Sequence, residues 1–135
     1  MMDAPPVVGV LEALEALAVE ELSAAQLGRA MRASGKARGR LDVVDARFLA
    51  AFDRMGGHRP DGATDTSSWL ASATKLSGRD AKRALRRAKV LEALPALGDK
   101  LAAGEVSAAH VDALAAVLPA KLVPTAGDLV GRRGR

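Results

Sequence analysis

The chain has no cysteine and no tyrosine, and its 135 residues include two phenylalanines and a single tryptophan. Without cysteine, a disulfide framework, a thiolate zinc site and a cysteine nucleophile are all excluded. The lack of cysteine is typical of a reducing compartment, so we expect a cytoplasmic protein. Because strands favour aromatic and β-branched residues, whereas alanine and leucine favour helices, the composition argues against a sheet-based fold.

Long hydrophobic runs are also missing. No stretch approaches the roughly 20 apolar residues that a membrane-spanning helix needs. The first six residues carry no basic residue of the kind that opens a signal peptide, and glutamates interrupt the apolar residues behind them. We therefore expect no membrane partner and no export, and the length suits one domain.

Apolar residues recur instead at three- and four-residue spacing, which is typical of amphipathic helices. We predict an all-α fold, a compact bundle of about six helices, in one domain over residues 1–124, with a disordered basic tail over 125–135. The expected helical segments are 7–21, 23–33, 41–55, 66–75, 78–94, 95–103 and 108–118. Ser23, Ser77 and Ser107 are the expected caps, Pro95 starts a helix that Gly104 closes, and Pro119 and Pro124 are the expected stops. Ser34, Gly35 and Gly39 predict a bend or break after the second segment.

The expected core includes one face of segment 41–55 and the tryptophan. That face is formed by the apolar residues Leu41, Val44, Phe48, Phe52 and Met55. Trp69 is accompanied by Leu70, Ala73 and Leu76 at helical spacing, which indicates a core anchor and not a platform for stacking bases.

Charge is concentrated in one short segment. Between residues 75 and 89 stand seven basic residues and one acid, a net charge of +6 in a chain whose total is +4. The basic residues are Lys75, Arg79, Lys82, Arg83, Arg86, Arg87 and Lys89. On a helix they fan out opposite a small apolar face, and phosphates would relieve their mutual repulsion. These seven residues are therefore the candidate nucleic-acid-binding site.

The residues around this segment resemble a helix-turn-helix, with Leu76 as a buried leucine in the turn and Ser77 as the cap of the second helix. In that motif the second helix enters the major groove of double-stranded DNA by its N-terminal residues. Two features depart from the motif: Lys75 replaces the usual glycine, and Ala81 and Ala84 are smaller than usual. A solvated helix face and an acidic protein partner are the alternatives.

No catalytic constellation stands out. His58 and His110 are far apart in sequence and have no second ligand nearby, so we expect neither a metal site nor a cofactor. Motifs of nucleophile elbows, phosphate loops and dinucleotide folds are absent. We predict that the chain is not an enzyme.

The order of residues from Leu41 to His110 is similar to that of a known family. The matching residues are Leu41 to Gly57, Asp61-Gly-Ala, Ser68-Trp-Leu-Ala, Leu76-Ser, Ala81, Arg83, Ala88, Leu94-Pro and Leu101 to His110. They resemble the 13E12 repeat family of mycobacteria, whose shared N-terminal helical part is known as domain of unknown function 222. Longer members of that family continue into an HNH endonuclease module.

The resemblance implies a helical module that is associated with an HNH nuclease but lacks its catalytic residues, because the chain has two histidines and no asparagine. It thus looks like a truncated member. Two further hypotheses stay open: a protein-interaction module in which the acidic first helix pairs with the basic helix of another chain, and a non-functional remnant. A homo-oligomer or a missing C-terminal partner domain would fit these alternatives.

Overall fold

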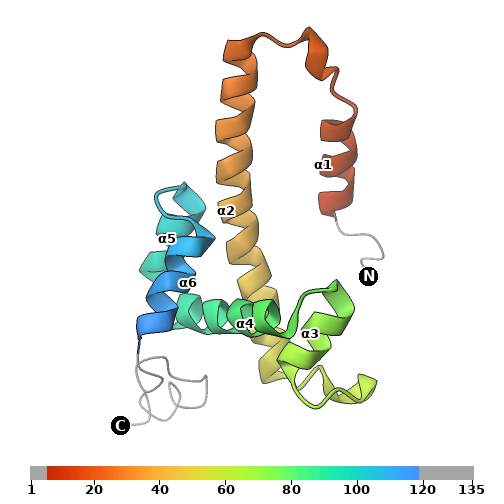
Figure 1. The fold of residues 1–135 in the computed structure, drawn as a ribbon, viewed down its shortest axis with the longest axis vertical. Coiled ribbons are helices and arrows are strands. Elements are labelled where there is room, and N and C mark those ends of the chain that lie inside the picture. The colour runs from red at the N-terminus through yellow and green to blue at the C-terminus, as the bar shows by residue number, and fades with distance from the viewer. Residues whose placement is uncertain (1–5, 119–135) are drawn as a thin grey trace. The chain divides into compact units, whose positions relative to one another are not determined.

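A computed structural model describes residues 6–118 of the chain, which form α-helices and two short 3-10 helices without a strand (Figure 1). The prediction of an all-α fold is confirmed. The chain divides into two compact units, residues 1–34 and 35–135. The six α-helices are α1 (Pro6–Glu15), α2 (Ala24–Arg54), α3 (Thr66–Thr74), α4 (Gly78–Ala93), α5 (Pro95–Ala103) and α6 (Ala108–Val117). The tail predicted for 125–135 and the expected stops at Pro119 and Pro124 lie outside the described residues.

The first unit holds α1, a 3-10 helix at Val19–Glu21 and the start of α2. The predicted helix over 7–21 is too long, since α1 ends at Glu15. Ser23 caps α2 as expected: its Oγ accepts from the backbone N–H of Gln26 at 3.1 Å, and Gln26 Oε1 accepts from the backbone N–H of Ser23 at 2.8 Å. This reciprocal pair of hydrogen bonds satisfies two donors that the helix start leaves free.

The predicted break near Gly35 is wrong, because α2 continues without interruption for 31 residues. A glycine inside a helix costs about 1 kcal/mol relative to alanine, which does not break a helix that tertiary contacts support. One of the glycines has a packing role. Gly39 is buried, and a Cβ atom there would collide with the backbone carbonyl oxygen of Leu101 on α5.

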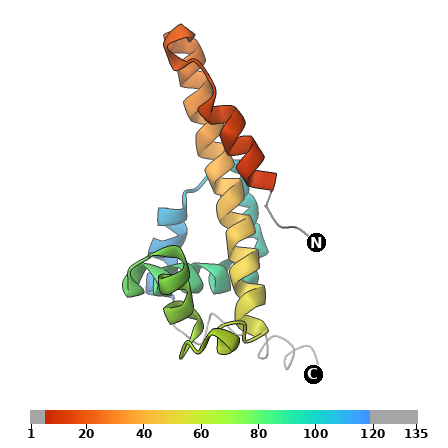
Figure 2. The same cartoon turned by 90° about the vertical axis from the view of Figure 1, so that its right-hand side faces the viewer.

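In the second unit, α4 lies across the C-terminal half of α2, and α5 and α6 pack beside it (Figures 1 and 2). Small residues of α2 form its buried face, at Gly39, Ala46 and Ala50. They meet a core that consists of Ala88, Val90, Leu91, Leu101, Val111 and Ala115. Small side chains let the helices approach closely, and this stripe replaces the bulky one that the sequence indicated.

The predicted core face of α2 is consequently wrong in most of its members. The side chains of Phe48 and Met55 are 66% and 81% exposed, and Leu41 is also exposed. Leu76 was expected to be buried in the turn before α4, but it is 39% exposed. Trp69 is half-buried: its ring lies 4.2 Å from that of Phe52, and its Nε1 donates to Asp61 Oδ2 at 2.7 Å.

The ends of α4, α5 and α6 agree with the sequence, whereas the cap of α3 is Asp65, which the sequence did not indicate. Asp65 caps α3 by accepting from the backbone N–H of Ser68 at 2.8 Å, and Ser77 caps α4 by accepting from that of Asp80 at 3.0 Å. Pro95 opens α5, and Gly104 closes it with a φ of 81°, a left-handed conformation that suits glycine. Among the described helices, none combines the length and apolar character needed to cross a bilayer.

Candidate nucleic-acid interface

The candidate site starts at the turn between α3 and α4, which consists of Lys75, Leu76 and Ser77. Lys75 has φ 61° and ψ 27°, the left-handed conformation that ends a helix. Since this conformation is the one that glycine adopts most easily, the backbone at Lys75 has the shape that a glycine would give this turn. The pair α3 and α4 is therefore two packed helices joined by three residues.

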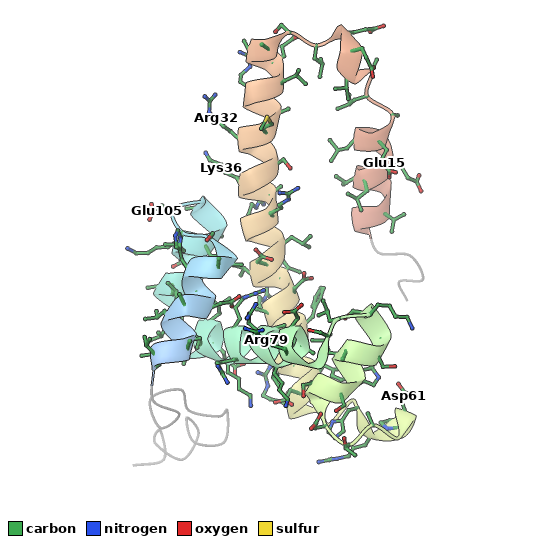
Figure 3. The ribbon with its side chains drawn as sticks, viewed as in Figure 1. Glu15, Arg32, Lys36, Asp61, Arg79 and Glu105 are labelled. Carbon is green, nitrogen blue, oxygen red and sulfur yellow. The ribbon has the colours of Figure 1, made fainter. Side chains whose placement is uncertain are left out.

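Four exposed cations cover one side of the N-terminal half of α4: Arg79, Lys82, Arg83 and Arg86. Their spacing of three and four residues places them on one face. At 1.5 Å of rise per residue, the face from Arg79 to Arg86 is about 10 Å long. Arg79 is labelled in Figure 3, on the α4 ribbon. We call these four residues the basic face of α4.

Helix α6 limits the basic face. Val90 follows Arg83 by seven residues and so lies on the same side of α4, yet it is completely buried. It belongs to the core cluster together with Val111 and Ala115 of α6. The prediction that one side of α4 is apolar and the other basic is therefore correct only for the first turns of the helix. Further along, α6 covers the side on which the cations lie.

Arg87 is not part of the exposed surface, contrary to the prediction. Its Nε and one terminal nitrogen donate to the two carboxylate oxygens of Asp112 on α6, at 2.7 and 2.6 Å. Both side chains are largely buried, with 22% and 15% of their surfaces exposed. The hydrogen bonds to Asp112 raise the pKa of Arg87, and burial opposes them. Arg87 therefore ties α4 to α6.

The other predicted binding residues differ in their surroundings. Lys75 is exposed in the turn, whereas Lys89 is half-buried. Lys89 lies beside Lys82 and Arg86 in a groove between α4 and α6 of about 430 Å³. Arg83 has one acidic neighbour, Asp80, at 3.5 Å on the same helix. Such an exposed pair contributes about 0.5 kcal/mol at most, so it leaves Arg83 available to a phosphate.

A second basic segment escaped the sequence analysis. Residues 29–40 contain five basic residues and no acidic one. All five are exposed on α2, and Figure 3 labels Arg32 and Lys36 among them. The count of charges that identified α4 would have found this segment too. The predicted break near Gly35 divided it between two elements, so the cluster was not apparent.

Both histidines have structural partners. His110 Nδ1 accepts from the backbone N–H of Ser107 at 3.1 Å, and Ser107 Oγ accepts from that of His110 at 3.2 Å, which caps α6. His58 Nδ1 lies 3.5 Å from the hydroxyl of Thr66, which donates to Asp53 at 2.6 Å. Within residues 6–118, no three histidine or carboxylate side chains gather in a way that could hold a metal ion.

Comparison with known families assigns most of the chain. The sequence model of a domain of unknown function, DUF222, matches residues 15–133. Comparisons with curated proteins and with solved structures gave no match. The matched range includes α2 to α6 and so contains the whole candidate interface.

Proposed function

We propose that this chain, which belongs to the DUF222 family, is a non-catalytic module that binds double-stranded DNA through the basic face of α4. The observation that carries the proposal is the exposure of Arg79, Lys82, Arg83 and Arg86 on one side of a helix whose opposite side buries Ala81 and Ala88. The basic face has no aromatic side chain on which unpaired bases could stack, which favours a duplex over a single strand.

The dimensions suit a major groove. The groove is about 12 Å wide, and a helix with its side chains is about 10–12 Å across. The free part of α4 is its N-terminal half, and this is the part that enters the groove in a helix-turn-helix. Helix α3 would then lie across the phosphate backbone. The N-terminus of α4 adds a favourable partial charge for a nearby phosphate.

The proposed role in a longer protein follows from the resemblance to the 13E12 repeat family. Its longer members carry an HNH endonuclease module, and we propose that the helical part holds such a module on DNA and does not itself cut it. The family model that matches is that of a domain of unknown function. A helical part joined to a nuclease module in this way would act on DNA in the cytoplasm of a prokaryotic cell.

Substitution of three cations tests the proposal. We expect that replacing Arg79, Arg83 and Arg86 with glutamine weakens binding to a duplex. The slope of the logarithm of the affinity against the logarithm of the salt concentration should become shallower by about three, because each lost phosphate contact removes about one. The affinity is measured by fluorescence anisotropy over a series of salt concentrations.

The matched control removes the same charge from α2. The variant Arg29→Gln, Arg32→Gln, Arg38→Gln loses three exposed cations outside the basic face. We expect it to keep most of the affinity. If the α2 variant loses more affinity than the α4 variant, or if the two are equal, the basic face of α4 is not the principal site.

A further inference from the structure

The N-terminal part of the chain is both acidic and apolar. Residues 1–28 include five acidic residues and no basic one. On α1 the side chains of Val10, Leu11 and Leu14 are 59%, 49% and 56% exposed. Their spacing places them on one side of the helix, with Glu15 at its edge beside Leu11, whereas Glu12 lies on the opposite side. An apolar helix face of this kind is typical of an interaction site.

The groove between α4 and α6 has the complementary character. It is lined by Lys82, Leu85, Arg86 and Lys89 of α4 and by Ala115, Ala116 and Leu118 of α6. Its lining therefore combines three cations with apolar side chains and includes no acid. Two other grooves of the same unit contain carboxylates: Asp45 in one, and Glu92 with Asp99 in the other. An acidic apolar helix fits the first groove best.

We propose that α1 of a second copy of this chain docks in the α4–α6 groove. The leucines of α1 would cover Leu85 and Leu118, and Glu15 at the edge of the leucine face would lie against the cations Lys82, Arg86 and Lys89. The ten residues of α1 span about 15 Å, enough to run along the about 10 Å from Lys82 to Lys89. Because each copy offers one helix and one groove, reciprocal exchange gives a closed, symmetric dimer.

The dimer and the duplex would compete, since Lys82 and Arg86 belong to the groove and to the basic face. Docking of α1 replaces phosphates by carboxylates at the same cations. Self-association therefore limits access to the basic face when the protein is concentrated. The proposal does not depend on DNA binding, because the dimer can be measured without DNA.

Charge reversal on α1 and in the groove distinguishes specific pairing of the two from non-specific association. One variant carries Glu15→Lys, and the other carries Lys82→Glu, Arg86→Glu and Lys89→Glu. We expect each variant alone to dimerise about tenfold or more weakly than the parent, because like charges then face each other. The 1:1 mixture should regain the dimer, since each helix then meets a groove of opposite charge. Sedimentation equilibrium gives the dimer dissociation constant of the full chain in four samples: the parent, each variant alone and the 1:1 mixture.

The control variant Arg29→Glu, Arg32→Glu changes exposed charges outside the groove and should dimerise like the parent. A monomeric parent at all concentrations would overturn the proposal, including the case in which α1 covers the groove of its own chain. So would dimers that survive both reversals, or variants that stay monomeric when mixed. Circular dichroism of each variant shows whether the helices are retained, and restoration in the mixture requires that both are folded.

Discussion

At the scale of single residues, the most informative side chain is Arg87, because it looks like its neighbours in the sequence and behaves differently in the structure. Arg83 and Arg86 are exposed, whereas Arg87 makes two hydrogen bonds to Asp112 and is mostly buried. Charge count cannot separate these cases. The signal that could have done so is Asp112, the one acid of the alanine-rich α6, which requires a partner if it is buried.

This pair gives a stability prediction. Replacing Asp112 with alanine leaves the guanidinium of Arg87 partly buried without a carboxylate, and we expect a loss of about 2 kcal/mol in the free energy of unfolding. Replacing both residues, as Arg87→Met with Asp112→Ala, should recover part of this loss. Urea denaturation of the parent, the single variant and the double variant gives the three free energies of unfolding.

The exposed pair of Arg83 and Asp80 is the matched control, and Asp80→Ala perturbs a salt bridge of 3.5 Å in which both side chains are about half exposed. The loss of that pair should cost about 0.5 kcal/mol or less. Equal losses for Asp112→Ala and Asp80→Ala would mean that the Arg87 pair does not hold α4 against α6.

At the scale of elements, the helices and their caps followed from local chemistry, but their buried faces did not. Ser23, Ser77, Ser107, Pro95 and Gly104 act where the sequence predicts, since a cap depends on residues three or four positions away. The face that α2 buries depends on what packs against it. Bulky apolar residues suggested a face with Phe48, whereas close packing selected Gly39, Ala46 and Ala50.

Two glycines of α2 test this interpretation, because the same substitution should have opposite effects. A Cβ at Gly39 would collide with the backbone of Leu101, so Gly39→Ala should lower the free energy of unfolding by about 1–3 kcal/mol. Gly35 has open space around its Cβ position, so Gly35→Ala should raise the helix propensity and add about 0.5–1 kcal/mol. Thermal denaturation followed by circular dichroism measures both, and a stabilising Gly39→Ala would contradict the packing.

At the scale of the whole molecule, the sequence predicts the all-α class and its family resemblance, and most of its helix ends. It predicts less well which charges reach solvent. The burial of Val90 shows why: the basic side of α4 ends at this apolar residue, which belongs to a core cluster shared with Val111 and Ala115 of α6. Val90 is the local signal of that boundary, but which helix packs there depends on residues far along the chain. The free cations that remain are grouped at the N-terminal half of α4, and the account of function depends on that group.

If a duplex neutralises the basic face of α4, the affinity of the unaltered protein for DNA should fall as the salt concentration rises. Four cations that contact phosphates should give a slope of about −3.6 for the logarithm of the affinity against the logarithm of the salt concentration. A slope near that value, with weaker binding to single strands of equal length, is the predicted result. No measurable affinity for duplex DNA at low salt, or an affinity that does not change with salt, would contradict the account.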